Sequence, residues 1–155
     1  LGEREIRKWV TLVALQGMSA QKMDGTISLS LIRGRFAQLL ARKTGFRKQQ
    51  NDLYLTGLFS LLDVLLQRPM ELILDEVKAP KETREVLLHG TGPYCEIYNA
   101  VLAYEKGEWD NMAQSARHFN LDTSAVAESY VQAIRWHPLT AASRLQIHNL
   151  APEMS

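Results

Sequence analysis

Four histidines are the residues best suited to metal binding or acid–base chemistry, and their spacing favours neither. No two are separated by the three or four residues that place side chains on adjacent turns of one helix; they are His89, His118, His137 and His148. None is followed by an aspartate, and the sequence has no H-E-x-x-H motif. We interpret them as surface or helix-end residues and predict no metal ligand. A site assembled from residues distant in sequence stays open.

The chain also lacks the patterns typical of a nucleophilic or phosphate-binding site. There is no G-x-S-x-G motif, and Cys95 has no basic neighbour in sequence that would lower the pKa of its thiol. We interpret Cys95 as a small buried apolar residue at the start of a helix. The glycines of residues 90–93 are too few to surround a phosphate, and Pro93 removes an amide donor. We therefore predict no catalytic residue and no cofactor.

Composition indicates an ordinary globular protein. Of 155 residues, 46% are apolar and 23% are charged, and the net charge of +1 is too small to attract nucleic acid or a membrane through the overall field. The single cysteine excludes an intramolecular disulfide and fits a reducing compartment. No apolar run approaches the roughly 18 residues needed to span a bilayer. We expect a cytoplasmic protein and, because the chain begins at Leu1 and is predicted to be helical by Glu3, a piece of a longer one.

Apolar periodicity predicts helices along the whole chain. They cover residues 3–17, 27–43, 50–67, 69–77, 81–89, 94–106, 109–119 and 123–137. Residues 17–25 are the first predicted loop, Thr26 or Ser28 would cap the helix that follows, and Gly45 would close it in a left-handed conformation. No run alternates apolar and polar residues between turns, so no sheet is expected. The prediction is an all-α bundle of seven or eight helices, with residues 139–155 as a partly ordered tail.

The stretch of residues 54–70 is apolar on nearly every side of its predicted helix. Leucines recur at the three-and-four spacing, and Leu61 and Val64 fill much of the opposite side. Asp63 has no oppositely charged residue within a turn of it in sequence. Pro69 should end the helix because proline lacks the N–H group. A helix of this kind belongs in the middle of a bundle.

Two further stretches have features of nucleic-acid contacts. The first is a basic stretch, made of Arg33, Arg35, Arg42, Lys43, Arg47 and Lys48. We interpret it as an exposed helix face with cations near the helix C-terminus, where the helix dipole favours them. The second is the outline of a helix-turn-helix in residues 109–137, but its second helix begins with Thr123 and Ser124 rather than with basic residues. We predict no nucleic-acid partner.

Four blocks of sequence, in this order, resemble one family. They are IRKWVTLVALQGM (residues 6–18), LYLTGLFSLLDVLLQRPM (53–70), AYEKGEWD (103–110) and YVQAIRW (130–136). Together they resemble the HDOD domain, the HD-related output domain that follows an EAL domain in two-domain bacterial signalling proteins. The resemblance implies that residues 1–138 are the C-terminal portion of an HD-domain-like helical fold.

The resemblance also implies that the metal site of the parent superfamily is lost. HD proteins are metal-dependent phosphohydrolases with a G-L-L-H-D-I-G run, whose histidine and aspartate ligate the metal. Alignment of Gly57-Leu58-Phe59 with G-L-L places Ser60 at the histidine and Leu61 at the aspartate. Leucine cannot ligate a cation, and Asp63 points elsewhere on the helix. The family is known for this loss.

The expected function is therefore a non-catalytic output module that acts through protein–protein contacts. Its partner would be an EAL domain of the same longer chain, which resembles cyclic-di-GMP phosphodiesterases, or another protein. Neither a membrane nor nucleic acid is expected as a partner, and homodimer formation stays open. A residual metal-dependent phosphohydrolase is the alternative, and a DNA-binding regulator is the third.

Overall fold

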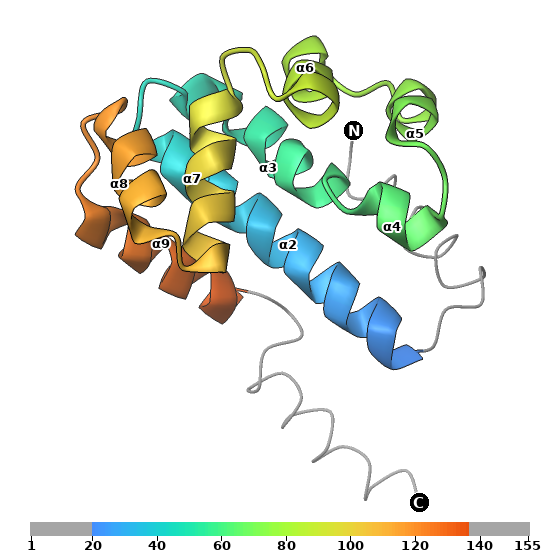
Figure 1. Ribbon diagram of the computed structural model, residues 1–155, viewed down its shortest axis with the longest axis horizontal. Helices are drawn as coiled ribbons and strands as arrows, with labels where there is room; N and C mark the ends of the chain where they lie inside the picture. The colour runs from blue at the N-terminus through green and yellow to red at the C-terminus, as the bar shows by residue number, and fades with distance from the viewer. Residues whose placement is uncertain (1–19, 137–155) are drawn as a thin grey trace, which may run out of the picture.

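The computed structural model describes residues 20–136, and this part of the chain is entirely helical, with no strand. Its helices are α2 (Ala20–Arg42), a 3₁₀ helix η1 (Arg47–Gln49), α3 (Gln50–Phe59), α4 (Leu62–Leu66), α5 (Met70–Glu76), α6 (Lys81–His89), α7 (Cys95–Lys106), α8 (Trp109–Arg117) and α9 (Thr123–Trp136) (Figure 1). The predicted all-α fold is confirmed. The predicted helix over 3–17 and the tail 139–155 lie outside the described residues. None of the described helices is both long and apolar enough to cross a membrane.

The first described helix is longer than predicted. It begins at Ala20, so the expected loop over residues 17–25 is wrong from there onward, and Gly25 lies inside the helix. A single glycine costs a helix about 1 kcal/mol relative to alanine, which a helix of 23 residues tolerates. The two predicted caps are also interior positions, and Ser30 illustrates why such residues fit there. Its hydroxyl donates to the carbonyl of Thr26 one turn back, at 3.0 Å.

The end of α2 also differs from the prediction. Gly45 does not have the positive φ that a left-handed helix end requires. Instead, the N–H groups of Lys43 and Thr44 bond to carbonyls three residues earlier, at 3.1 and 3.2 Å. Such bonds tighten the last turn into 3₁₀ geometry and satisfy the terminal carbonyls without glycine.

The predicted central helix over 50–67 is two helices. α3 ends at Phe59 and α4 begins at Leu62, with Leu61 at φ −117° and ψ 7° between them. The hydroxyl of Ser60 donates to the carbonyl of Gly57 at 2.6 Å and so competes with the backbone bonds of a continuing helix. α4 ends before Pro69, because Gln67 adopts a left-handed conformation with φ 51°.

The helices after Pro69 begin and end close to where the sequence predicts. Pro69 and Pro80 immediately precede α5 and α6, and Gly107 closes α7 with φ 71°. Asp122 caps α9, since its carboxylate accepts the N–H of Ser124 at 3.3 Å. Cys95 is an exception: it is half-buried rather than buried, and its thiol donates to the carbonyl of residue 90 at 3.0 Å.

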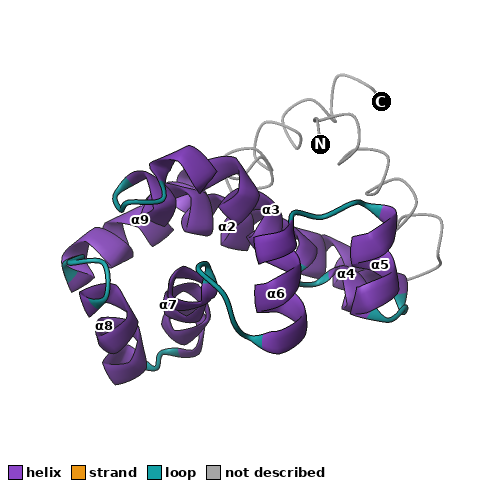
Figure 2. Cartoon of the chain, turned by 90° about the horizontal axis from the view of Figure 1, so that it is seen from above, coloured by secondary structure: helices purple, strands orange, loops and turns teal. Residues whose placement is uncertain are grey.

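The apolar side chains form two clusters. The large core joins α2, α3, α6, α7, α8 and α9, and includes Phe36, Leu40, Leu53, Ile97, Val101 and Val126. The small core joins the end of α3 to α4 and α5, and includes Leu58, Leu62, Leu65, Ile73, Leu74 and Val77. Leu87 of α6 packs against both clusters. Figure 2 shows α4 and α5 at one end of the molecule and α8 and α9 at the other.

α2 and α3 cross at a pair of glycines that lies between the two cores. A Cβ atom on Gly57 would lie 2.5 Å from the Cα of Gly34. A Cβ atom on Gly34 would lie 2.7 Å from the carbonyl oxygen of Tyr54. The two backbones therefore touch, and a side chain at either position would separate them. This contact brings Arg33, next to one glycine, close to Ser60, one turn beyond the other.

Candidate functional site

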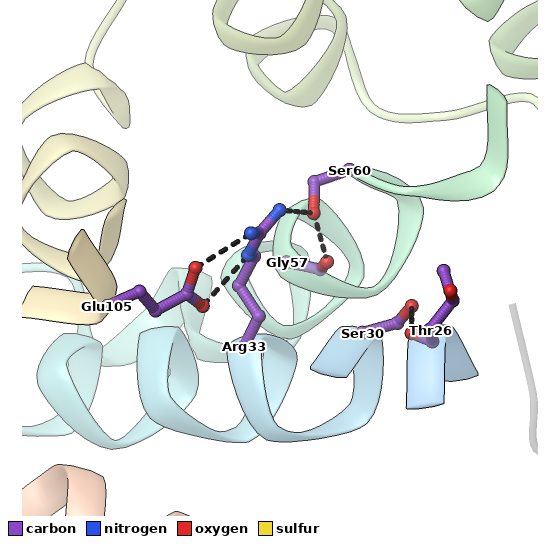
Figure 3. A network of polar contacts seen from close by, with 6 residues as sticks. All are labelled: Thr26, Ser30, Arg33, Gly57, Ser60 and Glu105. Atoms are coloured by element: carbon purple, nitrogen blue, oxygen red, sulfur yellow. Dashed lines mark hydrogen bonds and ion pairs between the residues drawn. The ribbon is translucent and has the colours of Figure 1, made fainter. Parts of the chain in front are cut away.

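The candidate site is the break between α3 and α4, where the HD resemblance places a metal-binding pair. Ser60 follows the last residue of α3 there, and the side chain of Arg33 reaches it from the middle of α2. The Nη1 of Arg33 donates to the Ser60 hydroxyl oxygen at 2.9 Å, and that hydroxyl donates in turn to the Gly57 carbonyl. Figure 3 shows the guanidinium between Ser60 on one side and Glu105 on the other.

Glu105 of α7 completes this network. Its two carboxylate oxygens accept from Nε and Nη2 of Arg33 at 3.0 and 2.7 Å, a bidentate arrangement. The two side chains are only 10% and 14% exposed. One arginine therefore joins α2, α7 and the end of α3 through buried or half-buried polar groups.

The electrostatics of the site keep a fixed positive charge beside Ser60. Burial disfavours the charged form of Arg33, but the hydrogen bonds and charge of Glu105 outweigh it and raise the pKa of the guanidinium. Tyr98 of α7 also faces this network. Burial raises the pKa of its phenol, although the charge of Arg33 and the Ser60 hydroxyl oppose that change. Tyr98 is therefore neutral at pH 7 and can serve only as a hydrogen-bonding and packing group.

Of the remaining residues singled out from the sequence, Leu61 and Asp63 lie at this break, whereas the two described histidines do not contribute to its hydrogen-bond network. Leu61 is half-buried, and the carboxylate of Asp63 accepts the N–H of its neighbour Val64 at 2.9 Å. His89 and His118 are exposed, and the other two histidines lie outside the described residues. Within residues 20–136, no group of three or more His, Cys, Asp and Glu side chains could hold a metal ion.

The placement of Arg33 contradicts the exposed basic face that we expected. Arg33 as a whole residue is only 8% exposed, and its guanidinium is paired with Glu105. The signal for this was available, because Arg33, Phe36 and Leu40 follow one another at the three-and-four spacing of a helix face, and Phe36 and Leu40 are buried. The partner, however, lies 72 residues away in sequence.

The other basic residues of that stretch are dispersed. The guanidinium of Arg35 lies 5.1 Å from the ring centroid of Trp136, and Lys43 donates to the Ser129 hydroxyl at 3.0 Å. Arg47 and Lys48 are exposed in η1. The expected solvated face is thus reduced to the end of α2 and the turn that follows it.

A second surface feature is a groove between α7 and α8. Its volume is about 370 Å³, and its walls are mostly polar, with Asn99 and Lys106 from α7 and Asn111 and Gln114 from α8. Ser115 and His118 also line the groove, and the His118 ring lies 3.9 Å from the carboxylate of Glu96, but the Ser115 hydroxyl makes no hydrogen bond to that ring. No group of described residues there could hold a metal ion. The break between α3 and α4 therefore remains the stronger candidate.

Comparison with known proteins links the chain to parts of longer ones. Neither a protein-family model nor a solved structure matches it. It is 32% identical over 139 residues to the uncharacterized protein YuxH of Bacillus subtilis (strain 168). The matched region covers 88% of this chain and 33% of YuxH. It is 28% identical over 136 residues to the cyclic di-GMP phosphodiesterase CdgJ of Vibrio cholerae serotype O1. The matched region covers 88% of this chain and 32% of CdgJ. The chain spans about a third of the length of these curated relatives, and it is homologous to that third.

Proposed function

We propose that the chain is a non-catalytic output module of the HDOD type, which acts through protein contacts on an attached phosphodiesterase-like domain or on another protein. Homology to one third of CdgJ supports a role linked to cyclic di-GMP. The remaining two thirds of such a protein are long enough to carry the phosphodiesterase activity that its name states. The part represented here would then regulate that activity rather than perform it.

The hydrogen bond from Arg33 to Ser60 carries the proposal. In the HD resemblance, Ser60 and Leu61 stand where two metal ligands would lie. A guanidinium already occupies the space beside Ser60, and its charge repels a divalent cation. Glu105 balances the charge of this guanidinium, so the Glu105 carboxylate is not available as a metal ligand. The arrangement favours packing and hydrogen bonding over metal chemistry.

Metal content and hydrolysis test the absence of catalysis. The full 155-residue chain would be purified with added Mn²⁺, Fe²⁺ or Zn²⁺, analysed for bound metal, and assayed with cyclic di-GMP. We expect less than one metal per ten chains and no turnover. Stoichiometric metal together with turnover that is lost on chelation would contradict the proposal and favour the residual phosphohydrolase.

Regulation in cis is tested in a longer relative such as CdgJ. Removal of the homologous third should change the rate of cyclic-di-GMP hydrolysis by at least threefold if that third acts on the rest of the chain. A rate that stays the same would assign the module to a separate protein partner. Recovery of the original rate when the 155-residue chain is added back would show that contact, rather than chain length, carries the effect.

The DNA-binding alternative receives no support from α9. Its first turn presents Thr123 and Ser124, and Ser124 is bonded to Asp122 through both its N–H and its hydroxyl. That acidic cap lies where a recognition helix would approach phosphates. Steeply salt-dependent binding to duplex DNA would reverse this assessment.

A further inference from the structure

Residues 61–79, which we name the α4–α5 segment, form a distinct part of the molecule. They contain α4 and α5, and most of their apolar side chains belong to the small core, whereas Val64 and Leu72 are exposed. The segment begins at the helix break after Ser60 and ends before Pro80, the residue that precedes α6. Both ends therefore lie where the helical hydrogen bonding is already interrupted.

The α4–α5 segment has little stability of its own. α4 has five residues and α5 has seven, and isolated helices of that length do not persist in water. Gln67 and Lys78, on either side of α5, have φ angles of 51° and 53°. A side chain at such an angle is strained, so the connections cost free energy that tertiary contacts must offset.

Few polar contacts tie the segment to the rest of the described chain. Arg68 pairs with Glu76 inside the segment, and Asp75 pairs with Arg84 of α6 at an exposed position. At the other boundary, Ser60 is held by the buried guanidinium of Arg33. Because Glu105 fixes that guanidinium in turn, the direction in which the chain leaves α3 depends on a group anchored in α7.

We infer that Arg33 is a positioning residue for the α4–α5 segment: its bond to Ser60 keeps the segment closed, and loss of that bond lets the segment open as a unit while the large core stays folded. Opening needs no assumption about function. An open segment would uncover Leu55 and Leu58 of α3, which are buried in the small core when the segment is closed.

Hydrogen exchange followed by mass spectrometry on the full chain tests this inference. Ser60→Ala removes the hydroxyl and leaves the Arg33–Glu105 pair in place. We expect the amides of residues 62–79 to exchange at least tenfold faster, the size expected for a lost hydrogen bond to a charged group. The amides of α7 and α9 should change by less than twofold.

Ser30→Ala is the matched control. It also removes a serine hydroxyl that donates to a carbonyl one turn back, at 3.0 Å, but that hydroxyl is not bonded to the Arg33 guanidinium. Its exchange in residues 62–79 should stay within twofold of the parent chain. Equal acceleration in both variants would assign the effect to a general loss of stability and overturn the inference.

A second variant keeps the inference testable if the alanine change is too mild. Arg33→Met combined with Glu105→Met removes the cation that holds Ser60 without leaving a buried charge unpaired. The large core should remain protected, and residues 62–79 should again exchange at least tenfold faster. Unchanged exchange in those residues, or a uniform increase over the whole chain, would show that Arg33 does not control the segment.

Discussion

The large core and the small core are built differently although one pair of crossing helices, α2 and α3, contributes to both. In the large core, aromatic rings pack edge to face, with Phe36 5.5 Å from Tyr104 and 5.4 Å from Tyr130 between centroids. The small core is almost entirely aliphatic and is covered by helices of five and seven residues. Stability is therefore not uniform along the chain.

The polar groups between the helices differ in the same way. Around the large core each side chain bonds to one neighbouring element, as in the pair of Thr56 and Thr83 hydroxyls at 2.8 Å and the bond from Tyr94 to Asp52 at 3.0 Å. At the border of the small core, Arg33 connects three helices at once. The comparison indicates that this border, not either core, is where the position of one part of the molecule can depend on another.

The largest effect should come from the glycine contact that serves both cores. Gly57→Ala places a methyl group against the backbone of Gly34, so the helices must separate, and we expect a loss of about 5 kcal/mol in the free energy of unfolding. Urea unfolding monitored by circular dichroism measures it. Gly25→Ala, with nothing within 4 Å of the new methyl, should instead stabilise by up to about 1 kcal/mol. Comparable losses of unfolding free energy in both variants would contradict the close backbone contact between α2 and α3.

The next effect concerns the border. Arg33→Met should cost about 3 to 5 kcal/mol because it leaves a buried carboxylate unpaired. Adding Glu105→Met should restore most of that loss, to within about 1 kcal/mol of the parent chain. Urea unfolding of both single variants and the double variant completes the cycle. Additive losses would mean that the two side chains do not act as a pair.

Matched leucines sharpen the comparison of the cores. Leu40→Ala in the large core should cost about 4 kcal/mol, whereas Leu74→Ala in the small core should cost about 2. The small core can collapse further because the α4–α5 segment is short and joined by strained residues. Urea unfolding of both variants under the same conditions measures the difference between the two losses of unfolding free energy. A larger loss at Leu74 would show the small core to be the more rigid of the two.

The smallest effect is the pH dependence that Tyr94 adds to the large core. Burial, followed by the hydrogen bond to Asp52 and the charges of Asp52 and Glu82, raises the pKa of its phenol. The unfolded chain then releases this proton at lower pH than the folded chain does. The contribution of Tyr94 to the free energy of unfolding is fully present below about pH 10, the pKa of tyrosine in the unfolded chain. It is lost as the pH rises above that value.

Tyr94→Phe isolates this contribution. Between pH 9 and 11, the free energy of unfolding should fall less steeply in the variant than in the parent chain, after both are referred to their values at pH 7. Parallel curves would show that the phenol does not take part.

Much of the local structure was predictable because its signals are local. Pro80 and the glycine at residue 90 bracket α6, whose predicted bounds match the observed Lys81–His89. Gly107 and Asp122 likewise mark helix ends through backbone conformation and capping. The start of α2 and the division of the central helix were missed, since a tolerated glycine and a serine hydroxyl leave no periodic trace.

The sequence by itself determined the helical class, most helix ends and the presence of Ser60 and Leu61 at the break, because these depend on residue type and near neighbours. Only the tertiary structure decided what surrounds Ser60. Arg33 is buried because Gly34 and Gly57 let two backbones touch, and it stays charged because Glu105 arrives from 72 residues away. Burial of a charge is a property of the surrounding atoms, and those atoms are gathered only when the chain folds.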